Sequence, residues 1–501
     1  MPSPAAAAPV RPAPASWSAS GSTSAPLVRR QAILLPLAAV AVGYAGPGSR
    51  RAALLAGALA AAVPAGAALL ARLGRSAAGP APGGPPTGAP PEATSVTLLV
   101  PARDESPVIG RLVADAAAVR SAPMALIVVD DASSDGTGDL AAAAIERHRL
   151  GGEASVVRVA SPSGSKASAL RCAPVAPGVV VVLDADARLT PGFVDRVRSA
   201  VGPDGVAQAR RRMLRPAGRG RRAWWPRALA LAQDGEQAVD DQIARARFAL
   251  GGAAEFRGDG MVIGTSVLGA LGGWPTDALC EDLELATRWY LHSGRGVPRP
   301  PDLEIWEQPV LSVRSLLAQR LRWAEGSIRR DLRLVAPAAL DPRVPRRRRA
   351  ELVGYASQAL LPWASLGLAL RALGEPTLLP GGSRGRVGRD GTASPSAAAA
   401  RRLLALLAVG YGSGAVILAW AALGDGLPAR GSAATGRHGF SPLSRLVRAF
   451  SVGAFTGLWP LVLPAAWIRV ARQPGAPQFV RTPHASPDAF SEPEPPRPPR
   501  T

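Results

Sequence analysis

Four short, valine-rich runs separated by helix-like stretches place the strongest constraint on the fold. The runs cover residues 96–100, 126–129, 155–159 and 179–183, and they do not alternate apolar and polar residues. Strands that are buried on both faces of a sheet have this continuous apolar character. Helical stretches between such strands are typical of βαβ units. We therefore predict one α/β domain over residues 96–335, built around a mainly parallel sheet.

Apolar segments flank this domain on both sides. Only 19% of the residues are charged, whereas soluble domains usually carry about a quarter. Residues 31–73 hold two apolar runs split by a Gly-Pro-Gly-Ser turn, which predicts two transmembrane helices. About three more are predicted within residues 350–470. The two runs of the first part are 32–45 and 52–71, and the three of the second are 352–370, 403–423 and 450–468.

The remaining segments are low in apolar periodicity. Residues 1–30 are rich in Pro, Ala and Ser, and residues 471–501 are rich in Pro, so both are predicted to be disordered tails. Residues 74–95 are interpreted as a Gly/Pro/Ala linker, and residues 374–400 as a disordered loop.

The arginine-rich residues 343–349 set the expected orientation in the membrane. Loops that carry clustered Lys and Arg usually stay on the cytoplasmic side. Two spans before residue 96 also return the chain to its starting side. We therefore expect a multi-pass protein of the cell membrane with a cytoplasmic catalytic domain, although the arginines of residues 374–400 would then lie outside.

The chain is strongly basic, with 58 Lys and Arg against 37 Asp and Glu and a net charge of +21. Such a balance indicates either nucleic acid or an anionic membrane surface as a partner. Acidic residues gather where the predicted strands end, which does not fit nucleic acid, so we expect no nucleic-acid partner. Two cysteines exclude a disulfide framework.

In open α/β sheets, ligands bind at the carboxyl ends of the strands. The first run is followed by Pro101 and Glu105, the second by Asp130 and Asp131, and the fourth by a carboxylate pair. Carboxylates that share one sheet edge repel one another. A cation or a ligand rich in hydrogen-bond donors, such as a ribosyl-uracil, would make this arrangement favourable.

The pair Asp184 and Asp186 can converge on one hard cation. Mg²⁺ or Mn²⁺ is held by one or two carboxylates together with phosphate oxygens of a substrate. Lys166, the only lysine of the chain, follows the third run, where a compact ammonium can meet a phosphate. The plainer alternatives are an unoccupied surface Asp-x-Asp pair and a solvated loop lysine.

Two further patterns lie downstream. Glu281 and Asp282 open an amphipathic helix, where Asp282 can be a base or only a helix cap. Gln319, Arg322 and Trp323 lie in a helical stretch that begins near residue 313. Trp323 can be part of a site or can anchor the helix at a membrane interface.

Taken in order, these motifs resemble the inverting glycosyltransferases of family 2. The resemblance covers about residues 94–335 and extends to membrane-embedded synthases of cellulose, hyaluronan, chitin and poly-N-acetylglucosamine. It implies the nucleotide-diphospho-sugar transferase type A fold with flanking transmembrane helices. The motifs that carry it are Pro101–Glu105, Asp130-Asp131, Asp184-Ala185-Asp186, Glu281-Asp282, Gln319-x-x-Arg322-Trp323, and the Phe256–Gly260 loop with Asp259.

The resemblance also implies roles for these residues. Asp282 would be the general base, with Glu281 the next choice, and Asp184 and Asp186 would hold Mg²⁺ or Mn²⁺. Trp323 would stack on the acceptor sugar. Pro101, Glu105, Asp130, Asp131, Lys166 and Asp184 would bind the nucleotide-sugar, while Asp259, Gln319 and Arg322 would meet the diphosphate or the acceptor.

The expected reaction moves a sugar from a cytoplasmic nucleotide-diphospho-sugar, most simply a UDP-sugar, to a growing polysaccharide or a membrane-associated acceptor. One alternative is the transfer of a single sugar to a polyprenyl phosphate or another lipid. An alternative of another class is an inactive membrane scaffold that binds nucleotide-sugars.

Overall fold

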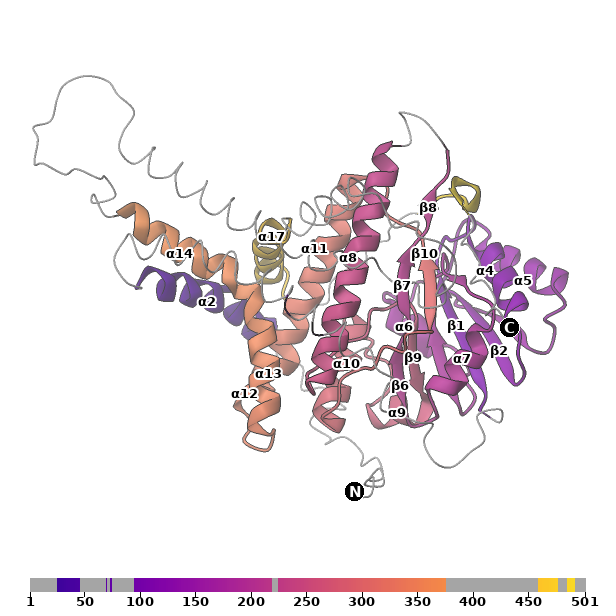
Figure 1. Ribbon diagram of the computed structural model, residues 1–501, viewed down its shortest axis with the longest axis horizontal. Coiled ribbons are helices and arrows are strands. Elements are labelled where there is room, and N and C mark those ends of the chain that lie inside the picture. Colours follow the sequence, from indigo (N-terminus) through magenta and orange to yellow (C-terminus); the bar gives the residue numbers. More distant parts are fainter. Residues whose placement is uncertain are drawn as a thin grey trace, which may run out of the picture.

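The computed structural model describes residues 25–45, 69, 73, 94–218, 224–374, 458–475 and 484–491. A six-stranded sheet lies at its centre (Figure 1). Its strands are β1 (Val96–Ala102), β2 (Met124–Asp130), β3 (Ala154–Arg158), β4 (Val179–Val182), β6 (Val206–Gln208) and β9 (Met261–Gly264), in the order β3-β2-β1-β4-β9-β6. The four valine-rich runs are β1 to β4, and they pair in parallel as predicted.

The sheet is mixed rather than wholly parallel, because β9 runs antiparallel to both β4 and β6. A parallel neighbour would require a crossover back to the amino end of the sheet. Instead, the chain reaches β9 from a loop at the carboxyl edge, where Gly260 N–H donates to the carbonyl of Val182. This loop carries Asp259, so the antiparallel strand brings an acidic residue to the predicted binding edge.

Successive residues of the strands enter two separate cores. Leu98, Val128 and Val181 pack into one core, and their neighbours Leu99 and Val129 into the other. Burial of each such side chain contributes about 1.5–3 kcal/mol. This is why the strands show unbroken apolar runs. Helices α4 (Ile109–Ala118), α5 (Thr137–Arg147) and α7 (Phe193–Ala200) cover the first face, and α6 (Lys166–Arg171), α9 (Thr265–Ala270) and α10 (Glu281–Ser293) cover the second.

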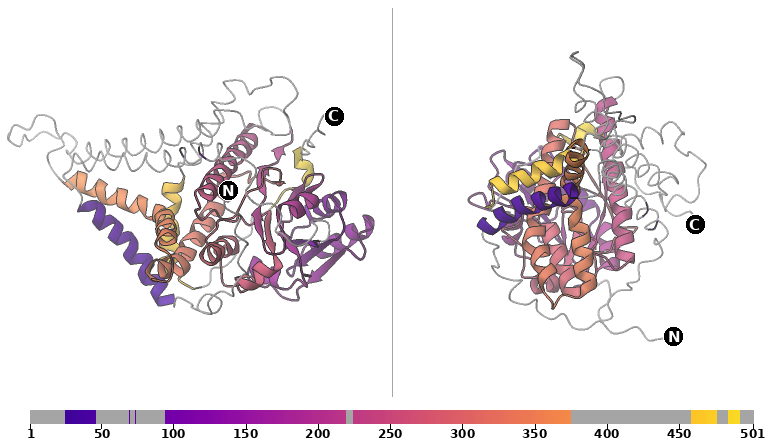
Figure 2. Two further views of the ribbon diagram at one scale, coloured as in Figure 1. Left: turned by 60° about the horizontal axis from the view of Figure 1, so that its bottom comes forward. Right: turned by 90° about the vertical axis from the view of Figure 1, so that its left-hand side faces the viewer.

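Two long helices and two small sheets complete the domain. The helices α8 (Trp224–Ala249) and α11 (Val313–Arg330) lie on the side of the sheet from which α2 (Ala25–Tyr44) and α14 (Leu361–Gly374) extend (Figures 1 and 2). A three-stranded sheet joins β5 (Arg188–Leu189), β10 (Glu304–Glu307) and β7 (Arg210–Met213). A two-stranded one joins β8 (Arg215–Pro216) to β11 (Phe490–Ser491).

The chain after α11 is helical but repeatedly interrupted. It forms the π-helical turn η2 (Asp331–Val335), α12 (Ala336–Leu340), α13 (Arg346–Ala356), the 3₁₀ turn η3 (Ser357–Leu360) and then α14. The later part of the chain contributes α17 (Trp459–Arg472) and the 3₁₀ turn η4 (Pro487–Ala489). Helix α17 packs on both α11 and α2, while α14 packs along α2.

The predicted membrane helices are corrected in part. Within the described ranges, α2 is the one helix that is long and apolar enough to cross a membrane, over Ala25–Val42. It begins inside the predicted tail, so residues 25–30 are helical. The predicted span 352–370 is instead divided among α13, η3 and α14, because a 3₁₀ turn interrupts it.

The other predicted spans fall largely or wholly outside the described residues. The structure does not describe residues 403–423, and it describes only Leu69 within residues 52–71. Within residues 450–468 it describes the part from 458 onward, mainly as α17. The disordered loop is likewise outside the description after Gly374. The multi-pass arrangement therefore stays a prediction.

The contact between α2 and α14 depends on a glycine. A side-chain carbon at Gly367 would lie 2.0 Å from the carbonyl oxygen of Val40, whereas one at Gly354 would meet no atom within 4 Å. The helices can approach this closely only because Gly367 has no side chain.

We expect Gly367→Ala to destabilise the protein by about 1–3 kcal/mol, because the added methyl group must push α2 away from α14. Gly354→Ala is the matched control and should be neutral or stabilising, since alanine favours helix. Thermal unfolding in detergent micelles measures both. Equal melting temperatures for the two variants would show that α2 does not pack here.

Candidate functional site

A cavity of about 830 Å³ lies at the carboxyl ends of β1 and β4 and extends between α8, α10 and α11. It gathers residues from motifs that are as much as about two hundred positions apart in the chain. With one exception, every predicted site residue lines it: Pro101, Glu105, Asp131, Lys166, Asp184, Asp186, Asp259, Asp282, Gln319, Arg322 and Trp323.

The exception is Asp130. Its carboxylate accepts a hydrogen bond from Ser133 N–H at 3.1 Å and stabilises the turn after β2. The neighbouring Asp131 does line the cavity, and its carboxylate accepts from Ser163 N–H at 2.7 Å. The sequence left open which of the two contacts a nucleoside, and the geometry favours Asp131.

Lys166 links the carboxylates that follow β4 to the start of α10. It begins α6, and its ammonium lies 2.5 Å from Asp184 Oδ1 and 3.7 Å from Glu281 Oε1. Burial lowers the pKa of Lys166, but Asp184 and Glu281 more than reverse this and hold it above its usual value. Conversely, burial would raise the pKa of Asp184, but Lys166 lowers it below the usual value. Both side chains are therefore charged at neutral pH.

Behind Asp184 lies a second carboxylate, that of Asp259. It is 1% exposed, and its Oδ1 accepts from the backbone N–H of Asp184 at 2.9 Å. Burial, together with Asp184 and Glu307, raises the pKa of Asp259 well above its usual value. Its second oxygen has no hydrogen-bond partner among the described residues. The predicted acceptor contact is thus placed beside the carboxylate pair.

Asp282 follows Glu281 in the first turn of α10 and lines the same cavity. Burial raises the pKa of Asp282, although the backbone N–H of Leu283 and the ammonium of Lys166 oppose this. Burial also raises the pKa of Glu281, to about 7, with Lys166 opposing and Asp282 reinforcing the rise. A carboxylate whose pKa is raised toward neutrality is a stronger base.

Trp323 forms a flat wall of the cavity. The guanidinium of Arg320 lies 4.3 Å from the centre of its ring, and that of Arg211 lies 5.9 Å away. Arg320 in turn donates to Gln319 Oε1 at 3.1 Å and pairs with Glu236 of α8. These cation–π contacts fix the ring orientation.

Sequence reasoning missed Arg211 of β7 and Glu307 of β10. Arg211 donates two hydrogen bonds to Glu307, at 2.7 and 2.9 Å, and a third to the carbonyl of Arg257 at 3.1 Å. Both residues line the cavity, and the guanidinium of Arg211 lies over the ring of Trp323. The only available signal was the run of three arginines at residues 210–212, which is unremarkable in so basic a chain.

Sequence reasoning also missed His484, which lies in a segment predicted to be disordered. Its Nδ1 lies 2.8 Å from Glu105 Oε2 and its Nε2 lies 3.6 Å from Asp186 Oδ1. Burial lowers the pKa of His484, but Asp186 and Glu105 raise it to about 9. A cationic imidazolium therefore lies beside the carboxylate pair at neutral pH.

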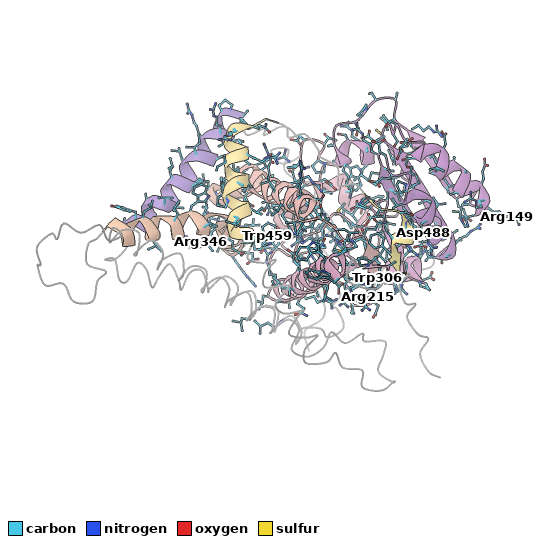
Figure 3. The ribbon with its side chains drawn as sticks, turned by 90° about the horizontal axis from the view of Figure 1, so that it is seen from above. Arg149, Arg215, Trp306, Arg346, Trp459 and Asp488 are labelled. Carbon is cyan, nitrogen blue, oxygen red and sulfur yellow. The ribbon has the colours of Figure 1, made fainter. Side chains whose placement is uncertain are left out.

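The segment that carries His484 is held in place by its backbone. Gln308 exchanges two hydrogen bonds with Ala485, at 2.9 and 3.0 Å, and Phe490 is buried where β11 pairs with β8. Residues 484–491 are therefore ordered against the sheet domain, contrary to the predicted tail. Figure 3 shows Asp488 of this segment on the sheet side of the molecule, well separated from Trp459 of α17.

Asp184 and Asp186 can supply only part of the ligand shell of a divalent cation. Among the described residues no three His, Cys, Asp or Glu side chains converge on one point. Asp184 is 42% exposed to the cavity, and Asp259 behind it has one oxygen without a hydrogen-bond partner among the described residues. Two carboxylates with phosphate oxygens completing the shell are typical of Mg²⁺ sites. The donor set is consistent with Mg²⁺ or Mn²⁺ that binds together with a diphosphate.

A comparison with known families fits this geometry. Residues 90–326 match the family model described as "Glycosyltransferase like family 2". These residues are therefore similar to glycosyltransferase family 2. The match ends within α11, three residues after Trp323, and so contains every predicted site residue. The protein is a glycosyltransferase.

Curated relatives are named for a glucolipid rather than for a polysaccharide. A beta-monoglucosyldiacylglycerol synthase from Synechocystis sp. is 27% identical over 407 residues, which cover 78% of this chain and 75% of the relative. The synthase of the same name from Trichormus variabilis is 29% identical over 253 residues, or 47% of this chain and 50% of the relative. The expected likeness to polysaccharide synthases is corrected accordingly.

Among solved structures, a mannosyltransferase from Pyrobaculum calidifontis in complex with GDP-Man and Mn²⁺ is similar to this chain. The two are 23% identical with a TM-score of 0.47, and the similarity covers 81% of this chain and 99% of that one.

We expect Asp282→Asn to lower the turnover rate by about 10²–10⁴, because the amide cannot accept the proton of an attacking hydroxyl. Donor affinity should change little, since the residues around Asp184 remain. Initial rates and donor titration on purified protein measure the two effects. Glu281→Gln is the matched variant. A large rate loss in Glu281→Gln with a normal Asp282→Asn would identify Glu281 as the base.

We also expect the turnover rate to fall as the pH drops below about 7. The pKa values of Glu281 and Asp282 are raised, so this pair takes up a proton near neutrality, and a protonated carboxyl cannot act as a base. Rates at saturating donor between about pH 5.5 and 8.5 test this. Glu281→Gln removes a neighbouring negative charge and should move the fall to lower pH. A flat profile would contradict the assignment.

Proposed function

We propose that this protein transfers one hexose, with inversion, from a nucleotide-diphospho-sugar to a membrane lipid of the diacylglycerol class. The observation that carries the reaction type is that Asp282 shares one cavity with the carboxylates at the end of β4, directly after Glu281, whose carboxylate pairs with the same Lys166 as Asp184 does. The names of the curated relatives support the lipid acceptor.

In this proposal the donor lies along the carboxyl edge of the sheet. Asp131 and Pro101 line the part that receives the nucleoside, for which UDP is the simplest choice. Lys166, Arg322 and the imidazolium of His484 supply positive charge for the diphosphate. Asp184 and Asp186 would hold Mg²⁺ or Mn²⁺, which when bound neutralises diphosphate charge and improves it as a leaving group.

The chemical step requires one proton acceptor. The acceptor hydroxyl gives its proton to a carboxylate oxygen of Asp282, and its oxygen forms a bond to the anomeric carbon. The bond from that carbon to the diphosphate oxygen breaks at the opposite face, and its electron pair leaves with the diphosphate. Attack opposite the leaving group inverts the configuration. Trp323 offers an apolar platform for the C–H groups of the reacting molecule.

The membrane setting follows from α2 and from the acceptor. A lipid acceptor stays in the bilayer, so the cavity must open at the membrane surface. Helix α2 offers one candidate span, with Leu34 and Leu37 exposed on it. We therefore place the catalytic domain at the cytoplasmic face of the cell membrane, where nucleotide-sugars are available.

The test incubates detergent-solubilised protein with a panel of radiolabelled nucleotide-sugars and dioleoylglycerol, and separates the products by size and polarity. We expect a glycolipid that carries one hexose from one preferred donor. Asp282→Asn, which keeps the donor site, is the control. A long glycan as product would instead support the prediction that the protein extends a growing polysaccharide. A wild-type protein that binds donors without turnover of any acceptor would support the inactive scaffold.

A further inference from the structure

The cavity changes character along its length. One end holds the carboxylates and cations described above. The other end is lined by residues of α13, η3, the start of α14 and α17, and these are predominantly apolar. The apolar lining consists of Ala356, Ala359, Leu361, Pro362, Trp459 and Leu463.

The apolar end lies beside helices that pack against α2, the candidate membrane helix. Helix α14 packs along α2, and α17 packs against α2 and α11. Side chains of α2, α11 and α17 share one apolar cluster, which includes Val28, Ile328 and Val462. Figure 3 shows Trp459 at the side of the molecule from which α2 and α14 extend. The apolar end is therefore level with the candidate membrane helix, whereas the polar end faces the sheet.

Three polar residues that also line the cavity are named the polar stretch here: Ser327 of α11, one helical turn after Trp323, Tyr355 of α13 and Gln358 of η3. Tyr355 directly precedes Ala356 in the chain, and Gln358 directly precedes Ala359, so both adjoin the apolar lining. The Tyr355 ring is fixed by the guanidinium of Arg247, 3.7 Å from its centre. Hydroxyl and amide groups can donate to ester carbonyls. A molecule with a free hydroxyl, ester groups and hydrocarbon finds a suitable partner for each of these parts in the lining.

We propose that the apolar end of the cavity, between η3 and α17, seats the acyl chains of the acceptor lipid. The lipid enters from the bilayer, its ester groups meet the polar stretch, and its free hydroxyl reaches Asp282. This inference rests on the proposed function in taking the acceptor to be a diacylglycerol-class lipid. It adds where that lipid binds and why long chains matter.

The test compares two leucines of one helix. Leu463 lines the cavity, whereas Leu461 is 72% exposed and does not line it. Leu463→Trp fills the apolar end, and Leu461→Trp is the matched control. Each methylene group kept from water contributes about fourfold to affinity, so loss of two buried methylenes corresponds to about tenfold or more.

KM is measured for dioleoylglycerol, for dibutyrylglycerol and for the nucleotide-sugar. We expect Leu463→Trp to raise KM for dioleoylglycerol by about tenfold or more. The KM values for the short-chain lipid and the donor should change by less than about twofold, because neither reaches the apolar end. Leu461→Trp should leave all three unchanged. If the Leu463→Trp protein unfolds at a lower temperature than the Leu461→Trp control, the same KM values are measured for Ala359→Leu, which fills the apolar end from η3.

The outcomes separate the two proposals. The acyl-chain seat would be overturned if Leu463→Trp changed KM equally for the long-chain and short-chain lipids, or if both leucine substitutions changed KM equally. In either case, glycosylation of the lipid by the wild-type protein would still support the proposed function. A wild-type protein that glycosylates neither lipid would overturn the proposed function and this inference with it.

Discussion

Carboxylates crowded at one edge of a parallel sheet are the constraint on which the rest of this structure depends. Asp184 and Asp186 leave β4 within a few residues of each other, and Asp259 is buried behind them. Such a cluster is unfavourable unless cations approach it. They come from distant parts of the chain: Lys166 from the start of α6, Arg211 from β7, and His484 from near the C-terminus. These ion pairs draw α6, β7 and the segment with His484 together around the carboxyl edge of the sheet.

The same charges connect the proposed donor site to the proposed acceptor site. Lys166 contacts both Asp184 and Glu281, and so joins the carboxylates after β4 to the start of α10, where the proposed base Asp282 lies. Arg211 contacts Glu307 and supports the ring of Trp323. Helix α11 carries Trp323 and also packs on α17, which in turn packs on the candidate membrane helix α2. Chemistry at a lipid surface requires such a connection between a polar site and apolar helices.

Local patterns predicted the parts of the structure that local interactions determine. The strands β1 to β4 follow from their unbroken valine runs, and the acidic residues after them follow from the parallel order. Long-range contacts were not predictable. Nothing in a Pro-rich tail indicates that His484 reaches Glu105, and nothing beside Asp130 and Asp131 tells which one faces the cavity. The 3₁₀ turn η3 likewise interrupts an apolar run that a hydropathy pattern takes for one helix.

The central claim is that the carboxylate edge binds a nucleotide diphosphate together with a divalent cation. The most direct measurement is calorimetric titration of the full-length protein in detergent with UDP and with GDP, in the presence of Mn²⁺ and in excess chelator. We expect one nucleotide to bind at least about tenfold more tightly with Mn²⁺, and Asp186→Asn to remove this difference while the protein stays folded. Equal affinity with metal and with chelator would contradict it.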